Sequence, residues 1–561
     1  MAADRLARAL LAALSLVVGN AVAQEDAGRI GERFEPPVEP RATRQPLAVP
    51  LDEKQAPEGA AAIRFVLQAV ELSGNAVFTD EAIAALWADL AGQEIGLPEI
   101  YRLRDAITTK YAQAGYGLSK ALVPEQRIGA DGVVRLEVIE GYIDEVVVDD
   151  PAGLGGADLE HAVMQITQQR PTNIRTLERY LLLANDRFGT RVMSTLKASD
   201  TQPGASTLLL SVEEAAPFEG GMNINNRGSE NVGPWQLHAY GRLNRLFGRP
   251  GQLSLAYATA TQTRELSYTS IGYTEVISSE GSSFALNWSR SESNPGDTTL
   301  RALDNHSESD SWSASLSHPF VRSRRQNLSA QLKYEHRKTT NFSLDTVTSL
   351  DRLDTLRLGI NYDQADTWGG INQALLEISH GLGGMRDDDA QKSRADGRID
   401  FTKYTLSLLR RQDLGSIQPA LNRWSLDTAL MAQYSDDGLL SGEECGLGGA
   451  QFGRAYDASE ITGDSCLAGS IELAYMADAS NTPFRHIQLF GFYDGGVTYN
   501  HTPPSNRDPQ TKRLSSVGLG LRFGIGAHLS GSVELTKPLS RDVADRGNDN
   551  PRIFASLAWR Y

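Results

Sequence analysis

The chain has 561 residues, of which 40% are hydrophobic, 22% charged and 7% aromatic, with 54 Lys and Arg against 70 Asp and Glu. The length predicts more than one domain, and no long apolar run follows the first 25 residues, which excludes a helical membrane protein. The net charge of −16 argues against nucleic acid as a partner, and two cysteines exclude a disulfide-stapled scaffold. A transmembrane β-barrel stays open, because its alternating strands look half-polar by composition.

Residues 1–23 have the three parts of a secretory signal peptide. Arg5 and Arg8 form a basic start, residues 9–18 are apolar but too few to span a bilayer, and Ala21-Val22-Ala23 is a small-x-small cleavage site. The alternative is an N-terminal membrane anchor, against which the short apolar run argues. The mature chain is therefore expected outside the cytoplasm, where disulfides form.

Residues 24–61 hold six prolines and many charges, so they are predicted to be a linker with a weakly signalled helix over 28–34. Two segments, 62–140 and 141–215, then predict the same β-α-α-β-β order. The expected elements of the first are a strand over 63–74, a helix from Thr79 to Leu90, a helix over 98–114, and strands over 118–123 and 133–139. Those of the second are a strand over 143–148, helices over 158–166 and 174–188, and strands over 191–198 and 207–212. A period of about 75 residues indicates an internal repeat, and the alternative is two unrelated α+β units.

Residues 216–561 show no convincing helix and alternate apolar and polar side chains with period two. Leu328, Ala330, Leu332 and Tyr334, for example, alternate with polar neighbours, which puts the two kinds on opposite faces of a sheet. Sixteen such segments begin near residues 218, 235, 251, 265, 283, 309, 327, 351, 371, 399, 423, 469, 484, 513, 529 and 552. Long connections are expected near 290–308, 338–350, 382–398, 435–468, 499–512 and 540–551, with short turns between them. This asymmetry is typical of an outer-membrane barrel, whereas a soluble β-sandwich, the alternative, is shorter.

The order of a signal peptide, a Pro-rich linker, two modules and sixteen strands resembles the two-partner secretion transporters, the haemolysin secretion and activation family. The resemblance implies α+β periplasmic POTRA (polypeptide-transport-associated) repeats followed by an all-β, 16-stranded antiparallel transmembrane barrel in the bacterial outer membrane. It implies translocation of a large partner exoprotein with an N-terminal secretion domain, which the POTRA repeats capture unfolded. It also makes residues 24–61 a possible plug segment of the barrel pore, as an alternative to a linker. The other implied partners are outer-membrane lipid, lipopolysaccharide, and the barrel assembly machinery during biogenesis.

Two motifs carry the resemblance in the barrel. Gly453-Arg454-Ala455-Tyr456, in the long loop 435–468, resembles the family's V-R-G-F/Y motif, which folds back into the lumen; Gly453 stands for the usual Val and Ala455 for the usual Gly. Residues 492–496 fit the F-x-D-x-G pattern at Phe492, Asp494 and Gly496. The resemblance implies that Arg454 pairs with Asp494 inside the barrel.

Three further interpretations concern the same loop. Glu472, predicted to point inward from strand twelve, is an alternative partner of Arg454, and a solvated Arg454 is the third reading. Cys445 and Cys466 lie 21 residues apart on either side of the motif. In an oxidising compartment we expect a disulfide, worth about 3 kcal/mol in the chain-entropy model, and the alternative is two free thiols.

The predicted substrate groove lies in the second module. An edge strand can add an extended peptide by β-augmentation, and we expect this at Arg191, Val192, Met193, Ser194, Thr195 and Leu196, beside the helix over 158–166. No Walker loop, zinc spacing or nucleophile elbow occurs, so no enzyme, metal or cofactor is expected. The alternative functions are an outer-membrane assembly insertase and a passive solute channel.

Overall fold

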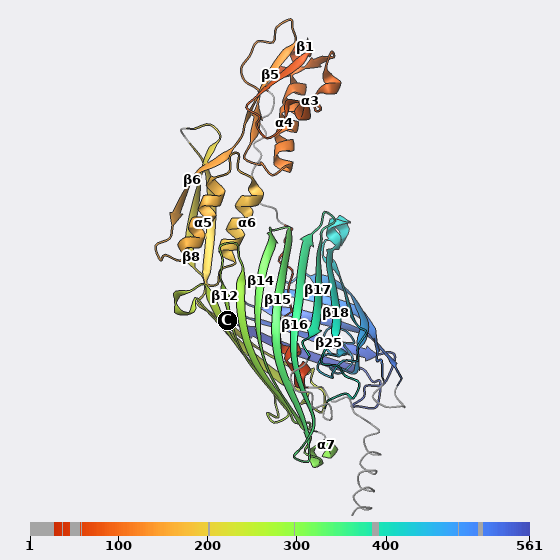
Figure 1. The fold of residues 1–561 in the computed structure, drawn as a ribbon. Helices are drawn as coiled ribbons and strands as arrows, with labels where there is room; N and C mark the ends of the chain where they lie inside the picture. Colours follow the sequence, from red (N-terminus) through yellow and green to blue (C-terminus); the bar gives the residue numbers. More distant parts are fainter. Residues whose placement is uncertain are drawn as a thin grey trace, which may run out of the picture.

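The computed structural model describes residues 27–35, 37–44, 57, 59–199, 202–296, 298–383, 392–480, 482–502 and 509–561. Two small α/β modules follow one another and lead into a β-barrel (Figure 1). The predicted signal peptide lies outside the described residues. Within them, no helix combines the length and the apolar character needed to cross a bilayer.

The two modules share one topology. The first consists of β1 (Arg64–Val66), β2 (Ala69–Ser73), α3 (Asp80–Ala84), β3 (Glu94–Gly96), α4 (Leu97–Gln113), β4 (Lys120–Leu122) and β5 (Val133–Ile139). The second consists of β6 (Tyr142–Asp149), α5 (Gly156–Thr167), α6 (Ile174–Asn185), β7 (Thr190–Ala198) and β8 (Ala205–Glu214). The sheets have the orders β2-β5-β4 and β6-β8-β7, with one parallel and one antiparallel pair each. The predicted repeat is therefore confirmed in its strand pairing.

The first strand of the first module differs from the prediction. A single strand was expected over residues 63–74, but the chain divides at Leu67 into β1, which pairs with β3, and β2, which pairs with β5. Leu67 is fully buried; its N–H donates to the Gln93 carbonyl at 3.0 Å and its carbonyl accepts from the Gly92 N–H at 2.7 Å. These bonds turn the chain from one sheet into the other, which a strand pattern alone cannot indicate.

Two helices are shorter than expected. Thr79 caps α3 as predicted, but α3 ends at Ala84 and a separate 3-10 turn carries Leu90. The helix predicted to reach residue 188 ends at Asn185, whose side chain bonds the backbone of Val192 in β7. The chain is thereby turned directly into the edge strand of the second module.

The barrel is closed by sixteen antiparallel strands, as predicted. They are β9 (Phe218–Asn225), β10 (Gln236–Asn244), β11 (Gly251–Ala260), β12 (Leu266–Val276), β13 (Ser283–Ser293), β14 (His306–Arg322), β15 (Gln326–Ser343), β16 (Thr346–Ala365), β17 (Gly370–Gly381), β18 (Thr402–Asp413), β19 (Trp424–Ser435), β22 (Ser465–Ala477), β23 (Phe484–Tyr499), β24 (Thr511–Ile525), β25 (Leu529–Pro538) and β26 (Arg552–Arg560). A short helix, α7 (Thr298–Ala302), lies at the end of the barrel far from the modules (Figure 1). Strand β26 pairs with β9 and closes the ring.

The alternation of side chains separates an apolar exterior from a polar lumen. On β15 and β16, Leu332 and Leu358 face outward and are exposed, whereas Glu335 and Arg357 face inward and are buried. A barrel in lipid needs this arrangement, because its outer face meets hydrocarbon while its interior holds polar groups.

The connection between β15 and β16 is not the predicted loop over 338–350. These strands have 18 and 20 residues and continue through that range to a turn at Leu344-Asp345, with φ values of 50° and 57°. Two left-handed residues in sequence suit a two-residue hairpin. Because neither residue is glycine, the sequence pattern indicates a loop rather than a tight turn.

An N-terminal helix, α2 (Ala27–Phe34), lies inside the barrel against β13, β14 and β15, red in Figure 1. Ile30 is fully buried in an apolar cluster with Ala258 and Tyr268, and the Ser291 hydroxyl donates to the Ala27 carbonyl at 2.6 Å. The predicted helix over 28–34 is thus present. This part of the 24–61 segment packs in the lumen instead of forming a free linker.

The second module is fixed to the barrel by a turn between β12 and β13. Glu280, in that turn, accepts hydrogen bonds from the Tyr180 hydroxyl at 2.7 Å and from Arg179 Nη2 at 2.9 Å, both on α6. His161 Nε2 of α5 lies 3.1 Å from the same carboxylate. Burial alone would raise the pKa of Glu280, but hydrogen bonds from Tyr180, Arg179 and His161 outweigh it and lower the pKa to about 2.

This contact predicts a pH-dependent attachment of the second module. Because the pKa of Glu280 is lowered, its contribution is complete above about pH 4.5 and is lost as pH falls toward about 2. We expect Glu280→Gln to raise the rate of proteolysis between module and barrel roughly fivefold at neutral pH, since such bonds contribute about 1 kcal/mol. The variant should also respond less to acid than the parent. Glu275→Gln is the control, because Glu275 lies on the same hairpin and accepts a hydrogen bond from the Tyr273 hydroxyl. If acid changed the proteolysis rate of the parent and of Glu280→Gln equally, the prediction would be contradicted.

Candidate functional site in the barrel lumen

The connection between β19 and β22 folds into the barrel. It contains a small hairpin of β20 (Cys445–Leu447) and β21 (Ile461–Gly463), and the residues between these strands form the loop tip. We call residues 436–464 the lumenal loop. The predicted disulfide joins Cys445 to Cys466, the second residue of β22. It therefore ties the hairpin to the wall while the tip extends inward.

Arg454, at the loop tip, reaches two acidic side chains of the wall at once. Its Nε lies 2.8 Å from Asp494 Oδ2 on β23, and its Nη1 lies 2.6 Å from Glu472 Oε2 on β22. Nη2 also donates to Ser470 Oγ at 3.0 Å. Arg454 and Glu472 are each 6% exposed and Asp494 is fully buried. Arg454 thus pairs with both Asp494 and Glu472, which the sequence had offered as alternatives. A solvated Arg454 is excluded.

Glycine and aromatic residues make this close approach feasible. The Arg454 guanidinium carbon lies 3.4 Å from the centre of the Phe492 ring, which adds a cation–π contact to the ion pairs. A Cβ at Gly496 would lie 2.8 Å from the backbone oxygen of Leu467 and 2.6 Å from Leu447 of the hairpin, so only glycine leaves room there. Gly453 has a φ of +78°, and its N–H donates to Asp494 Oδ1 at 3.1 Å. The glycine that stands in place of the usual Val therefore adopts a left-handed conformation, and Ala455 takes the following buried position.

The rest of the motif binds the loop tip to β24, to β26 and to the connection between β25 and β26. The Tyr456 hydroxyl donates to the carbonyls of Ser515 at 3.3 Å and Arg541 at 3.2 Å. Arg552 of β26 donates to the Ala455 carbonyl at 3.0 Å and to Asp457 at 2.6 Å. The tip thus contacts β22, β23, β24 and β26.

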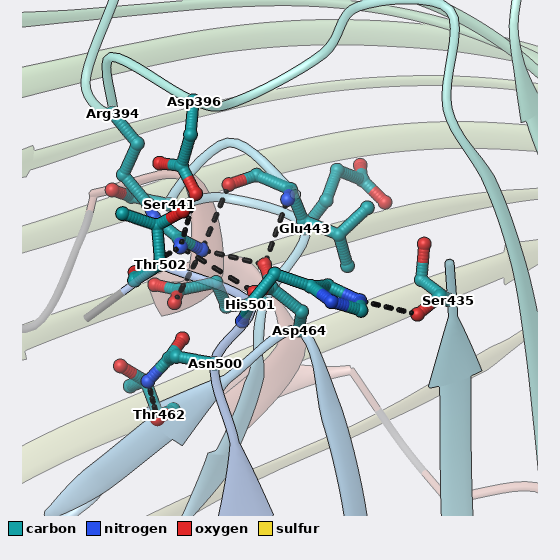
Figure 2. Close-up of polar contacts among 12 residues, drawn as sticks. Arg394, Asp396, Ser435, Ser441, Glu443, Thr462, Asp464, Asn500, His501 and Thr502 are labelled. Atoms are coloured by element: carbon teal, nitrogen blue, oxygen red, sulfur yellow. Dashed lines mark hydrogen bonds and ion pairs between the residues drawn. The ribbon is translucent and has the colours of Figure 1, made fainter. Parts of the chain in front are cut away.

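The outer base of the loop is held by a second buried carboxylate, Asp464 (Figure 2). Asp464 Oδ1 accepts from Arg394 Nη1 at 2.6 Å and from the Leu439 N–H at 2.7 Å, and Oδ2 accepts from the His501 N–H at 2.8 Å. The His501 ring lies 2.9 Å from the Ser435 carbonyl. Three connections at the far end of the barrel are therefore joined at the base of the lumenal loop.

The predicted groove residues lie on β7, which is an edge of the second sheet because it pairs only with β8 among the described strands. Met193 is 49% exposed and Leu196 37% exposed, whereas Val192 is buried. Helix α6 packs against β7, and α5 packs against β6 and α6. Leu159 and Ala162 of α5, the predicted neighbour, line one small hollow together with Val192 of β7.

Several lumen residues were not expected from the sequence. Glu443, Arg337 and Lys403 form a buried ion cluster with Arg357, and Asp464 holds the outer base. Their only sequence signal is a charge at an inward position of a strand or in the long loop. Many charges share that signal, so it does not identify a cluster.

Together, the closed sixteen-stranded barrel, the two modules beside it and the inward loop define an outer-membrane protein transporter. The model of the family described as "Haemolysin secretion/activation protein ShlB/FhaC/HecB" matches residues 204–523, and the ShlB-type POTRA domain matches residues 65–141. The first match covers more than half of the chain, which therefore belongs to this family of two-partner secretion transporters. The two modules are POTRA domains and lie in the periplasm, and the barrel lies in the outer membrane.

Individual relatives support the same assignment. The chain is 22% identical to the heme/hemopexin transporter protein HuxB of Haemophilus influenzae over 481 residues, covering 85% of this chain and 84% of the relative. It is 24% identical to the outer membrane transporter CdiB of Dickeya dadantii over 445 residues, covering 78% and 77%. The structure of CdiB from Escherichia coli is similar in fold, with a TM-score of 0.71 and 20% identity over 92% of this chain and 94% of that one.

Proposed function

We propose that this transporter exports a large exoprotein, which carries an N-terminal secretion domain and crosses the periplasm unfolded. In this proposal the protein acts without catalysis, and folding of the cargo outside the cell drives export. The POTRA modules capture the cargo first, and the barrel lumen is the path across the membrane. The free edge of β7 supports capture, because an extended peptide can add to it as a further strand.

The observation that carries the proposal is the occupied lumen. Helix α2 and the lumenal loop both lie inside the barrel, and two lumen cavities, of about 740 and 800 Å³, are both lined by Ala450, Gln451 and Phe452 of the loop tip. A cargo chain crossing the barrel must therefore displace α2 or the loop. In our proposal they occlude the pore at rest.

The surroundings of the barrel complete the proposal. Outward-facing Trp288 and Trp312 pair across β13 and β14 and are exposed, as expected for side chains that contact the lipid interface, including lipopolysaccharide. We further propose that β26, which ends close to the terminal Tyr561, is presented to the barrel assembly machinery during biogenesis.

Releasing α2 tests the proposal. Deleting residues 27–34 is expected to raise the conductance of the purified transporter in planar bilayers several-fold, because the helix no longer fills the lumen. Ile30→Glu should act in the same direction without shortening the chain, since it places a charge against Ala258 and Tyr268. Glu39→Gln, at an exposed position after the helix that lines neither cavity, serves as the control. Unchanged conductance in both lumen variants would refute occlusion by α2.

A further inference from the structure

The lumenal loop has a second inward contact, on a part of the wall distant from Asp494. Glu443, just before the disulfide hairpin, is 1% exposed. Its carboxylate lies 2.7 Å from Lys403 Nζ on β18, 2.7 Å from Arg357 Nη2 on β16 and 3.2 Å from Arg337 Nη2 on β15. The Glu443 carbonyl also accepts from Lys403 Nζ at 3.2 Å. One loop residue is therefore held by three strands.

Arg337 connects this contact to the N-terminal helix. Its Nη1 donates to the Gly442 carbonyl of the loop at 3.0 Å and to the Gly28 carbonyl of α2 at 3.4 Å. One guanidinium group thus binds both of the elements that fill the lumen. Its position depends on its acidic neighbours, since Arg337 is only 8% exposed.

The charge balance makes Glu443 the residue on which this arrangement depends. Three cations converge on Glu443, and the wall offers Glu335, 3.4 Å from Arg337 and 3.1 Å from Arg357, as a second buried anion. Without Glu443, Lys403 would lose the carboxylate 2.7 Å from its Nζ and Arg337 the one 3.2 Å from its Nη2. The acids left near the three cations would be Glu335, Glu377 at 3.7 Å from Arg357, and Glu32 of α2, which lines the same lumen cavity. The cations would then repel one another more strongly, so Arg337 would move and its 3.4 Å bond to the α2 backbone would weaken.

We infer that Glu443 is a positioning residue that couples the lumenal loop to α2, so that displacing one loosens the other. The inference rests on the proposed occlusion of the lumen by α2 and the loop. The loop then makes two separate attachments. Arg454 holds the loop tip to β22 and β23, and Glu443 holds Arg337, which bonds the backbone of α2. Cargo that moves either element would then open both.

The test follows α2 by thiol labelling in the full chain, embedded in outer-membrane vesicles. Ile30→Cys places a thiol where the native side chain is fully buried, so a bulky maleimide reaches it only when α2 leaves its site. Adding Glu443→Gln is expected to raise the labelling rate roughly tenfold, the factor that about 1.4 kcal/mol represents. Glu377→Gln is the matched control, since Glu377 lies 3.7 Å from Arg357 and bonds Ser379 on the same wall. Labelling of the Glu443→Gln protein at the rate of parent or control would overturn the inference.

A reciprocal measurement keeps the test decisive if Glu443→Gln fails to fold. Coupling between two elements is mutual, so deleting residues 27–34 should raise labelling of a Leu447→Cys thiol in the loop by a similar factor. Leu447 is 1% exposed and Glu443 is intact in this protein. If the deletion raises conductance but not loop labelling, the coupling is wrong and occlusion stands. If conductance does not rise, the proposed occlusion itself fails.

Discussion

Replacing Arg454 with alanine is expected to release the tip of the lumenal loop and to abolish secretion of the partner exoprotein. The substitution leaves Asp494 fully buried without its cation, and Glu472 keeps only Arg522, whose Nη2 lies 3.0 Å away. Breaking a buried ion pair by removing one partner costs about 3–5 kcal/mol. Two quantities are measured: secretion of the exoprotein, and the temperature at which the purified barrel unfolds, seen as the loss of its faster migration in gel electrophoresis.

Two further variants separate the role of geometry from that of charge. Arg454→Lys keeps the charge, but a single ammonium group cannot span Asp494, Glu472 and Ser470 as the guanidinium fork does, so secretion should be intermediate. Arg423→Ala removes an exposed arginine that pairs at 3.8 Å with Asp478, in the connection between β22 and β23, and should secrete normally. An Arg454→Ala protein that secretes like the Arg423→Ala protein would contradict the assigned role.

The fold was predictable where physical patterning is local and repeated. Each barrel strand must alternate, because one face meets lipid and the other the lumen, and the observed strands begin within a few residues of the predicted positions; the largest difference is Thr346 against 351. The hairpin turn at Leu344-Asp345 was missed because its left-handed residues are not glycine. For α2, the family resemblance left a plug in the pore as an alternative to a linker, but its contacts were not predictable, since Ile30 packs on residues more than 200 positions away in the sequence.

The lumen site was only half predictable for a related reason. Arg454 and Asp494 were indicated by two motifs of a known family, and Glu472 by its inward position on a strand. Which inward charges meet depends on register and on where the loop turns, and these place Glu443 beside three strands that are distant in the sequence. No pattern within a single strand carries that information.

The second prediction with a large expected effect concerns cargo capture at the free edge of the second POTRA domain. Along an antiparallel strand, the N–H and C=O of one residue point to the same side, and the side alternates with each residue. Val192 bonds the Asn185 side chain through both groups, and Ser199 donates to Ala205 of β8. Even-numbered residues of β7 therefore point to the free edge. By the same alternation, the N–H groups of Ser194 and Leu196 face this edge.

Ser194→Pro is therefore expected to block cargo capture while leaving the module folded. Proline removes an edge donor that the β7–β8 ladder does not use, and its ring obstructs an added strand. Losing one or two backbone hydrogen bonds, at about 1 kcal/mol each, should weaken binding of the cargo's N-terminal domain roughly five- to thirtyfold, with a matching loss of secretion. Binding of that domain to the purified transporter gives the measurement.

Two controls define what this result means. Ser194→Ala keeps the N–H and should bind cargo like the parent, so a defect there would assign the effect to the hydroxyl group. Thr195→Pro removes a donor that points toward β8 and should destabilise the whole module, because a central ladder bond is lost. If Ser194→Pro binds and secretes like Ser194→Ala, cargo does not add to this edge. Capture would then have to use side chains such as Met193, whose exposure does not depend on the backbone donor.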